Sequence, residues 1–236
     1  TYGETNSDLG YCVRQVSGGY VVSGENYGDG GTDAWLIKTD ENGTLLWSQT
    51  YDLGIETRAY SFDQVDSGGY VLTGMVATGA VGGNCFIIKT DIDGNQEWSQ
   101  TFGTYEAEDY AESIVESWGS SAFIIGGTTA SYGNGQKDAW LLKVDESGLI
   151  WQQTFGSDGN EYGYKVMRAS NLGYWLLGIN SFSKTWLIRT DSDGNEIASR
   201  DFASIQDRAY SMTKPNPDED NKDPLLVGYA DANTES

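Results

Sequence analysis

Four short acidic segments recur along the chain, and each ends in Gly. They are Asp40-Glu41-Asn42-Gly43, Asp91-Ile92-Asp93-Gly94, Asp145-Glu146-Ser147-Gly148 and Asp191-Ser192-Asp193-Gly194. Oxygen-bearing side chains two residues apart and followed by Gly resemble the start of a calcium-binding loop. The Ca²⁺ candidates are therefore Asp91 with Asp93 and Asp191 with Asp193, followed by Asp40 with Asn42. The same pattern is typical of a hairpin turn in which Asp accepts a backbone N–H and Gly adopts positive φ. We favour the turn, because the further ligands of a calcium loop are absent.

A second acidic position also recurs, two residues before a small residue that opens an alternating stretch. Its members are Asp8, Asp109, Glu161 and Asp207, and Thr57 stands there in the second repeat. In a propeller these acids would surround one mouth of the central channel, where they could hold a cation or attract a cationic ligand. The alternative, which we favour, is that each carboxylate caps backbone N–H groups of its own loop.

A basic residue recurs two positions before each turn Asp. The four are Lys38, Lys89, Lys143 and Arg189, out of only 14 cations in the chain. Their place on the same strand face as the turn Asp predicts structural ion pairs within or between repeats. Such pairs contribute to specificity more reliably than to net stability.

Composition excludes several classes of function. The net charge of −21 argues against nucleic-acid binding, because phosphates would be repelled. The absence of His removes the commonest general base and a common metal ligand, and no catalytic site stands out, so we expect no enzyme. No apolar run is long enough to cross a bilayer as a helix.

Two features concern covalent modification. Cys12 and Cys85 lie in different repeats, so the sequence leaves open whether they form a disulfide. Asn42-Gly43-Thr44 is a glycosylation sequon, which makes Asn42 an acceptor candidate in a secreted protein.

The elements that position these residues follow from an internal repeat of about fifty residues. The marker Thr-Tyr/Phe, usually followed by Gly, begins at residues 1, 50, 101 and 154, with a weaker copy at Asp201-Phe202. Each repeat contains an alternating stretch, a run ending in Gly, a run such as Asp33 to Asp40, and a run after the turn. Short segments rich in β-branched and aromatic residues and bounded by Gly, Asp and Asn predict strands.

Four strands per repeat predict propeller blades. The expected fold is all-β: a five-bladed β-propeller of four-stranded antiparallel blades, with the fifth incomplete. We expect one domain over 1–236, with repeats at about 1–49, 50–100, 101–153, 154–200 and a partial 201–236. Aromatic residues recur on the third strand (Trp35, Phe86, Trp140, Trp186) and on the fourth (Trp47, Trp98, Trp151). Fixed strand positions favour packing between blades over sugar binding.

The run from Asp33 to Gly43, continued to Trp47, resembles the repeats of secreted bacterial and archaeal β-propeller proteins. It also resembles the repeats of pyrroloquinoline-quinone-type propellers, with their Asp, turn Gly and Trp. The resemblance covers essentially the whole chain and implies the propeller fold. Such repeats occur in structural, adhesive and enzymatic proteins alike, so no catalytic residue is carried over.

The fifth repeat contains only two of the four expected strands. Its second strand, Leu225-Leu226-Val227-Gly228, would expose an apolar edge with unpaired N–H and C=O groups. Two explanations stay open: a truncated sequence, or completion of the blade by a strand from a neighbouring subunit. Repeated head to tail, the second arrangement builds a filament.

These observations predict a non-enzymatic extracellular or cell-surface structural protein, such as a subunit of a filament or surface layer. The alternative is a lectin-like or adhesive binding module, with Ca²⁺ as a conceivable ligand. We expect self-association and no nucleic-acid partner or membrane span, and carbohydrate stays open as a ligand.

Overall fold

The computed structural model describes residues 2–3, 7–28, 30–79, 82–169, 172–202, 208–213 and 224–229. The chain divides into two compact units, Thr1–Glu116 and Ser117–Ser236. The prediction of a single domain concerns how these units sit together, and it stays a prediction. Among the described residues, no helix is long and apolar enough to span a bilayer.

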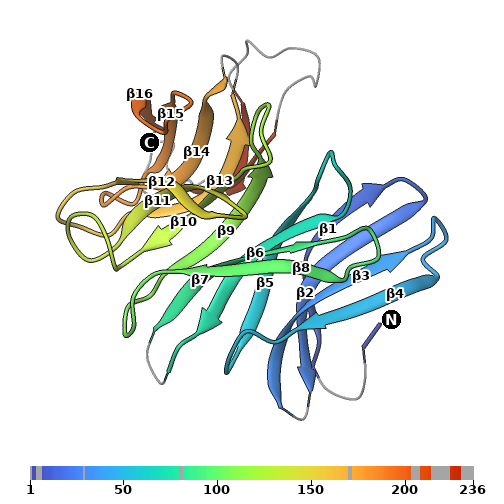
Figure 1. The fold of residues 1–236 in the computed structure, drawn as a ribbon. Helices are drawn as coiled ribbons and strands as arrows, with labels where there is room; N and C mark the ends of the chain where they lie inside the picture. Colours follow the sequence, from blue (N-terminus) through green and yellow to red (C-terminus); the bar gives the residue numbers. More distant parts are fainter. Residues whose placement is uncertain are drawn as a thin grey trace. The chain divides into compact units, whose positions relative to one another are not determined.

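The strands form four four-stranded antiparallel sheets, as the repeat predicts (Figure 1). All four are simple meanders, here called blades 1 to 4 in chain order. Blade 1 contains β1 (Leu9–Val16), β2 (Gly19–Gly28), β3 (Gly31–Thr39) and β4 (Leu45–Tyr51). Blade 2 contains β5 (Thr57–Gln64), β6 (Tyr70–Ala77), β7 (Gly83–Thr90) and β8 (Gln96–Phe102). Blade 4 contains β13 (Tyr162–Arg168), β14 (Tyr174–Ile179), β15 (Thr185–Thr190) and β16 (Glu196–Asp201).

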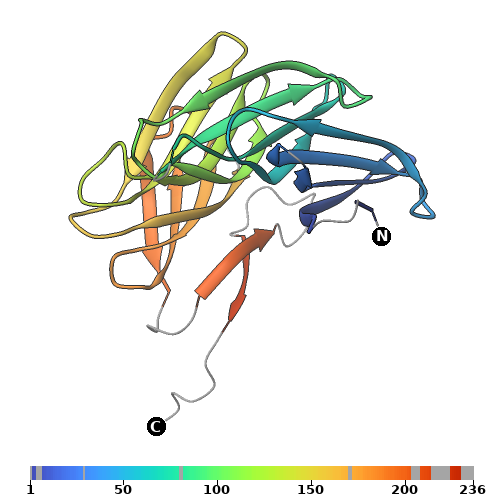
Figure 2. The ribbon, with the colours of Figure 1, turned by 90° about the horizontal axis from the view of Figure 1, so that it is seen from below.

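Blade 3 has the order β12-β11-β10-β9. Its strands are β9 (Tyr110–Glu116), β10 (Phe123–Thr129), β11 (Asp138–Asp145) and β12 (Gly148–Phe155). The fifth sheet, blade 5, is a hairpin of β17 (Arg208–Thr213) and β18 (Leu225–Tyr229), visible at the C-terminal end of the chain in Figure 2. The all-β fold, with four complete sheets and an incomplete fifth consistent with propeller blades, is therefore confirmed.

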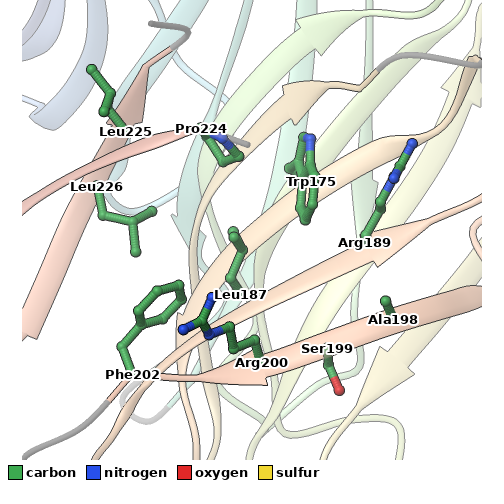
Figure 3. Close-up of a pocket in the computed structure, with 10 residues that line it drawn as sticks. All are labelled: Trp175, Leu187, Arg189, Ala198, Ser199, Arg200, Phe202, Pro224, Leu225 and Leu226. Atoms are coloured by element: carbon green, nitrogen blue, oxygen red, sulfur yellow. The ribbon is translucent and has the colours of Figure 1, made fainter. Parts of the chain in front are cut away.

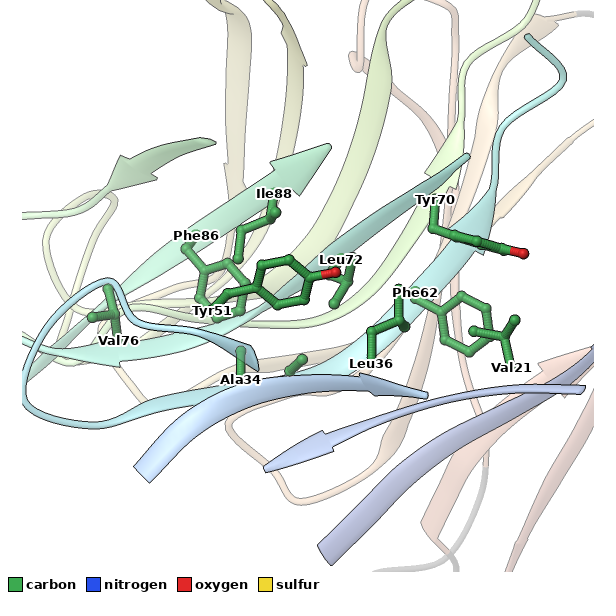
Figure 4. Close-up of a cluster of buried hydrophobic side chains, with 11 residues drawn as sticks. Val21, Ala34, Leu36, Tyr51, Phe62, Tyr70, Leu72, Val76, Phe86 and Ile88 are labelled. Carbon is green, nitrogen blue, oxygen red and sulfur yellow. The ribbon is translucent and has the colours of Figure 1, made fainter. Parts of the chain in front are cut away.

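Facing blades are joined by apolar side chains that alternate along the strands. In the first unit, Val21 and Leu36 of blade 1 pack with Phe62 and Leu72 of blade 2 and are fully buried (Figure 4). Alternation places these residues on one face because successive side chains of a strand point to opposite faces. In the second unit, Leu177 and Leu187 of blade 4 pack with Ala209 and Met212 of blade 5.

Isolated parallel bridges also connect successive blades at one end of the third strand. They join Thr32 to Glu56, Gly83 to Glu108 and Lys137 to Asn160. In each case the start of a third strand meets the loop that precedes the first strand of the next blade. The first strand of each blade is called its inner strand, and the fourth its outer strand. The bridges therefore bring the first residues of the third strand close to the recurrent acidic position.

Three of the four aromatic residues of the third strand belong to the core, as predicted, whereas Trp186 is only partly buried. Trp140 and Phe86 are fully buried, and Trp35 is nearly so. Trp35 Nε1 donates to Ser48 Oγ at 2.7 Å, and Trp140 Nε1 donates to Gln152 Oε1 at 3.2 Å. A buried indole N–H needs such an acceptor, which the neighbouring outer strand supplies.

The two cysteines are free thiols. Cys12 is partly buried and packs against the core between blades 1 and 2, whereas Cys85 is fully buried. Burial raises the pKa of the Cys85 thiol to about 12, which keeps it protonated and unreactive at neutral pH.

Candidate functional site

The four acidic segments are the turns between the third and fourth strands. In blade 2, Asp91 Oδ1 accepts the N–H groups of Asp93 and Asn95 at 2.9 and 2.8 Å, and Asp91 Oδ2 accepts Asn95 Nδ2. Asp191 makes the same three contacts with Asp193 and Asn195 in blade 4. In blade 1, Asp40 Oδ1 accepts the N–H groups of Asn42 and Thr44. In blade 3, Asp145 Oδ1 accepts the N–H of Ser147.

These hydrogen bonds favour the ionised form of the turn carboxylates. The pKa of Asp91 and that of Asp191 are lowered, chiefly by the side chains of Asn95 and Asn195, and the pKa of Asp40 is lowered chiefly by the Thr44 N–H. The geometry is that of the hairpin turn. Among the described residues, no three His, Cys, Asp or Glu side chains are grouped to hold a metal ion. Calcium binding by the turns stays a prediction, as does glycosylation of Asn42, which is exposed there.

The turn glycines have two roles that require Gly. Gly94 and Gly194 have φ of +79° and +80°, which side chains other than Gly rarely adopt. A Cβ on Gly94 would lie 2.9 Å from Trp47 Cζ3, and one on Gly194 would lie 2.6 Å from Trp151 Cζ3. Each turn therefore packs against the fourth-strand Trp of the preceding blade.

The recurrent acids before the inner strands accept hydrogen bonds in or near their own loops. Asp8 Oδ1 accepts Asn26 Nδ2 and the Tyr27 N–H, both at 2.9 Å. Asp109 Oδ2 accepts the Thr104 N–H at 3.3 Å, and Glu161 Oε1 accepts Ser157 Oγ at 2.9 Å. The Asp109 contact fits the capping interpretation, whereas the Asp8 contacts are with β2 and the Glu161 contact is with a side-chain hydroxyl. Asp207 lies outside the described residues, and a ring of acids around a channel mouth stays a prediction.

The recurrent basic position forms an ion pair in one blade and stacks on aromatic rings in two others. Lys89 Nζ lies 2.8 Å from Glu97 Oε2, so the predicted pair exists within blade 2. Lys38 Nζ instead lies over the Tyr70 ring of the next blade, 5.9 Å from its centroid. The Arg189 guanidinium lies 5.3 Å from the centroid of Trp175. An aromatic face is an alternative partner for a cation at this position.

The predicted assembly edge, Leu225 to Gly228, lies on β18. One edge of this strand pairs with β17. Leu226 points toward blade 4 and packs on its core, whereas Leu225 and Val227 are 54% and 57% exposed. Val71 and Thr73 occupy the same repeat positions in β6 of blade 2, and both are fully buried. Among the described residues, β18 pairs with no strand besides β17. Its exposed side chains and open edge make it the best candidate surface of the chain.

A groove of about 520 Å³ adjoins this edge (Figure 3). Its floor is the outer half of blade 4, and β18 with Pro224 forms one wall. Trp175, Arg189 and Ala198 form one cross-strand row of the floor, and Leu187 and Arg200 belong to the next row. Phe202 and Leu226 close the apolar end, where Figure 3 shows their side chains turned toward each other.

Sequence changes at two facing positions open this groove. At two complete interfaces, the fourth-strand Trp packs on a Tyr at the start of the next blade's second strand, and blade 3 has Phe123 at the Tyr position. The ring centroids are 5.9 Å apart for Trp47 and Tyr70 and 6.2 Å apart for Trp151 and Tyr174. Blade 4 has Ala198 at the Trp position, and blade 5 has Pro224 at the Tyr position. Both rings are therefore absent, and both replacements line the groove.

The electrostatics of the groove differ from those of the whole chain. Arg189 and Arg200 contribute two guanidinium groups to its lining, although the net charge is −21. The Arg200 guanidinium lies 5.1 Å from the Phe202 ring centroid, which orients it along the floor. The groove thus combines apolar surface with donors suited to carboxylates.

The structure also reveals tyrosines that sequence reasoning missed. The inner strands of blades 1, 2, 4 and 5 each contain a register shift, and the residue at the shift is Tyr11, Tyr60, Tyr164 and Tyr210 respectively. Tyr11 contacts Tyr60 in the first unit with centroids 5.2 Å apart, and Tyr164 contacts Tyr210 in the second at 5.4 Å. A β-bulge redirects a side chain, so these rings leave the regular alternation. The signal was present as a Tyr recurring after Gly or Ala.

No known protein family matches the chain, and no curated protein matches it. One similar solved structure is a protein of unknown function from Bacteroides caccae, with a TM-score of 0.51 and 10% sequence identity. The match covers 81% of this chain and 61% of that protein, so the chain spans less than two thirds of its length. At this identity the likeness concerns the fold alone.

Proposed function

We propose that this is a non-enzymatic structural protein of the cell exterior, whose subunits join when a strand segment of one subunit occupies the groove and the β18 edge of another. The observation that carries this proposal is the paired change at the blade 4 and blade 5 interface. Ala198 and Pro224 stand where two complete interfaces have Trp and Tyr, and a groove with an open strand edge lies between them.

The shape of the groove suits an extended segment. An open strand edge offers a row of backbone donors and acceptors, and an added strand satisfies them along its length. Side chains on one face of that strand would enter the groove between Trp175, Leu187 and Phe202. The added strand would also cover the outer part of blade 4. At the complete interfaces, the outer strands of the next blade cover the corresponding surface.

Charge complementarity points to a second copy of this chain as the occupant. The chain has 35 acidic and 14 basic residues, yet the groove presents Arg189 and Arg200. An acidic, apolar segment of a neighbouring copy would place carboxylates against these guanidinium groups. A segment of one copy in the groove of the next is a head-to-tail contact, which extends into a filament.

The test compares two single substitutions on β16. Ala198→Trp refills the groove with the residue of the complete blades, whereas Ile197→Trp adds the same bulk at the adjacent position, on the opposite face of the strand. We expect the wild type and Ile197→Trp to form larger species as concentration rises, measured by sedimentation velocity and electron microscopy, and Ala198→Trp to stay monomeric. A salt titration should weaken assembly, because it screens the Arg–carboxylate contacts.

A wild type that stays monomeric at every concentration would contradict the proposal. So would a variant Ala198→Trp that assembles as the wild type does. In either case, a structure showing the groove filled by a small molecule would redirect the function to ligand binding.

One observation favours the alternative of an adhesive or lectin-like module. Tyr11 and Tyr210, at the register shifts, are 41% and 50% exposed, and exposed aromatic rings are a surface on which sugar rings can stack. A glycan screen of the wild type and of Tyr11→Ala and Tyr210→Ala tests it. This alternative requires binding that the variants lose.

A further inference from the structure

Two buried acids meet at the interface of blades 3 and 4. Asp138 begins β11, and Glu161 directly precedes β13; each is 2% exposed. The Glu161 N–H donates to the Lys137 carbonyl at 2.8 Å, which holds the two segments together. The structure therefore brings two carboxyl groups from different blades into one enclosed place.

Gly156 defines that place. A Cβ added to Gly156 would lie 2.2 Å from Asp138 Oδ1 and 2.7 Å from Glu161 Oε2. The two oxygens therefore converge on the same small volume beside the Gly156 backbone. Gly133 packs on Asp138 in the same way, with the position of its Cβ 2.6 Å from Asp138 Oδ2. Glycines at both positions leave the oxygens uncovered by side chains.

One of these oxygens has no protein partner. Glu161 Oε1 accepts Ser157 Oγ, but Glu161 Oε2 is buried and accepts no hydrogen bond. Asp138 accepts the N–H of Asn134, and its Oδ1 faces Glu161 Oε2 across the space beside Gly156. A buried carboxylate beside a second one needs a compensating positive charge or a proton.

The equivalent positions in the other repeats contain their own donor. The third-strand residue and the acid-position residue are Asp33 with Thr57, Asn84 with Asp109, and Lys184 with Asp207. Asp207 lies outside the described residues, so the last pair is a match of sequence positions. A hydroxyl, an amide and an ammonium can each donate to a carboxylate. Asp138 with Glu161 is the one combination of two acids.

The Asn84 site shows how closely the geometry repeats. A Cβ on Gly103 would lie 2.7 Å from Asn84 Oδ1 and 2.5 Å from Asp109 Oδ2. A Cβ on Gly156 would lie between Asp138 and Glu161 in the same way. Rotation of the Asn84 amide by half a turn would direct its NH₂ toward this carboxylate, since amide O and N occupy similar positions. The two sites thus differ in the amide nitrogen that Asp138 lacks and in the additional methylene of Glu161 relative to Asp109.

We infer that Asp138 and Glu161 bind a hard divalent cation of the Ca²⁺ class between blades 3 and 4. The site supplies carboxylate oxygens in a nearly solvent-free place, and hydroxyl oxygens of Ser157 and Ser181 lie nearby, 3.4 Å from each other. Oxygen ligands of this kind suit Ca²⁺. The bound cation would link the start of β11 to the loop before β13. This site is separate from the acidic turns.

The experiment exchanges the amide and the carboxyl group at the third-strand positions of the two sites. Asp138→Asn gives the blade 3–4 interface the chemistry of the Asn84 site, and Asn84→Asp gives the blade 2–3 position the chemistry of the Asp138 site. Protein treated with EDTA and dialysed is titrated with CaCl₂ by calorimetry, and Tm is measured with and without Ca²⁺. We expect one Ca²⁺ in the wild type, none at this site in Asp138→Asn and two in Asn84→Asp, with Kd on the order of 10⁻⁴ M.

Tm should rise with Ca²⁺ in the wild type and stay constant in Asp138→Asn, which should remain folded because Asn84 with Asp109 is a similar pair of an amide and a carboxylate. Asp191→Asn serves as the control for binding at a turn and should retain the wild-type stoichiometry. Tb³⁺ luminescence sensitised by the nearby aromatic rings gives a second readout of occupancy. The inference is overturned if Ca²⁺ neither binds nor changes Tm in the wild type, which would indicate a shared proton. It is also overturned if Asp138→Asn binds Ca²⁺ as the wild type does.

Discussion

The interface of blades 1 and 2 and that of blades 4 and 5 are built from the same repeat but end differently. In the first, Trp47 lies between Tyr70 and the turn Gly94 of the next blade. In the second, Ala198 and Pro224 leave an apolar groove with two arginines. The inner halves of both interfaces are packed alike, by alternating apolar side chains. Closure of the outer half therefore depends on the fourth-strand Trp and its aromatic partner rather than on the core as a whole.

The largest expected effect comes from opening a closed interface. Trp47→Ala removes the partly buried ring from between Tyr70 and Gly94 and should destabilise the protein by about 2 kcal/mol, less than the loss of a fully buried aromatic ring. Urea denaturation followed by circular dichroism measures this loss. Ala198→Gly, a small change in the open groove, is the control and should cost far less. Equal losses in both variants would remove the distinction between the interfaces.

A second prediction concerns the buried hydroxyl of Tyr174, at the position where blade 5 has Pro224. Tyr174 OH lies 2.8 Å from Ser117 Oγ, and Tyr174→Phe should cost about 1.5 kcal/mol because Ser117 loses its partner. Burial raises the pKa of Tyr174. Its contribution is therefore complete below about pH 10 and is lost as the pH rises through the folded-state pKa. The variant should show a weaker loss of Tm between pH 9 and 11, and an unchanged alkaline profile would contradict this assignment.

A third prediction rebuilds the missing pair. If Ala198 and Pro224 face each other as Trp47 and Tyr70 do, then Ala198→Trp and Pro224→Tyr should stabilise each other by about 1 kcal/mol in a double-mutant cycle. Thermal unfolding of the wild type, both single variants and the double variant gives the coupling energy. Zero coupling would mean that the two positions do not face each other.

The smallest effect is expected at the turns, which both regions of the chain share. The pKa of Asp91 is lowered mainly by the Asn95 side chain, so its contribution is present above the unfolded pKa near 4 and is lost as the pH falls through the folded-state pKa. Asp91→Asn keeps an acceptor for the Asp93 and Asn95 N–H groups but does not titrate there. Tm measured between pH 5 and 2.5 should fall slightly less in the variant than in the wild type.

The sheets and most of the core could be predicted from sequence, because the strand period and the recurrent aromatic positions are local signals. Trp140 and Phe86 are buried where the repeat predicts them. The groove could not be predicted in this way, since it depends on residues from two blades that meet only in the folded chain. Its sequence signal is the break of the repeat at Ala198 and Pro224.

The acid pair was missed for a related reason. Glu161 was recognisable as a recurrent acid, but its neighbour Asp138 is the first residue of a strand and is separated from it by a whole outer strand. Only the bridge between Lys137 and Asn160 brings them together. If the first residue of each third strand is compared with the recurrent acidic position of the next repeat, Asp138 with Glu161 is the combination of two acids.

The meander order of the sheets has a consequence for synthesis of the chain. In blades 1 and 2 every strand pairs with its neighbour in sequence, so each pairing closes a short loop at small entropic cost. Blade 1 can therefore form on the ribosome as soon as Tyr51 has emerged, before blade 2 exists. Its apolar face, with Val21 and Leu36, then stays uncovered until β5 has been synthesised. At usual elongation rates this takes on the order of a second. Tight spacing of the blades thus limits how long each nascent face is open to aggregation.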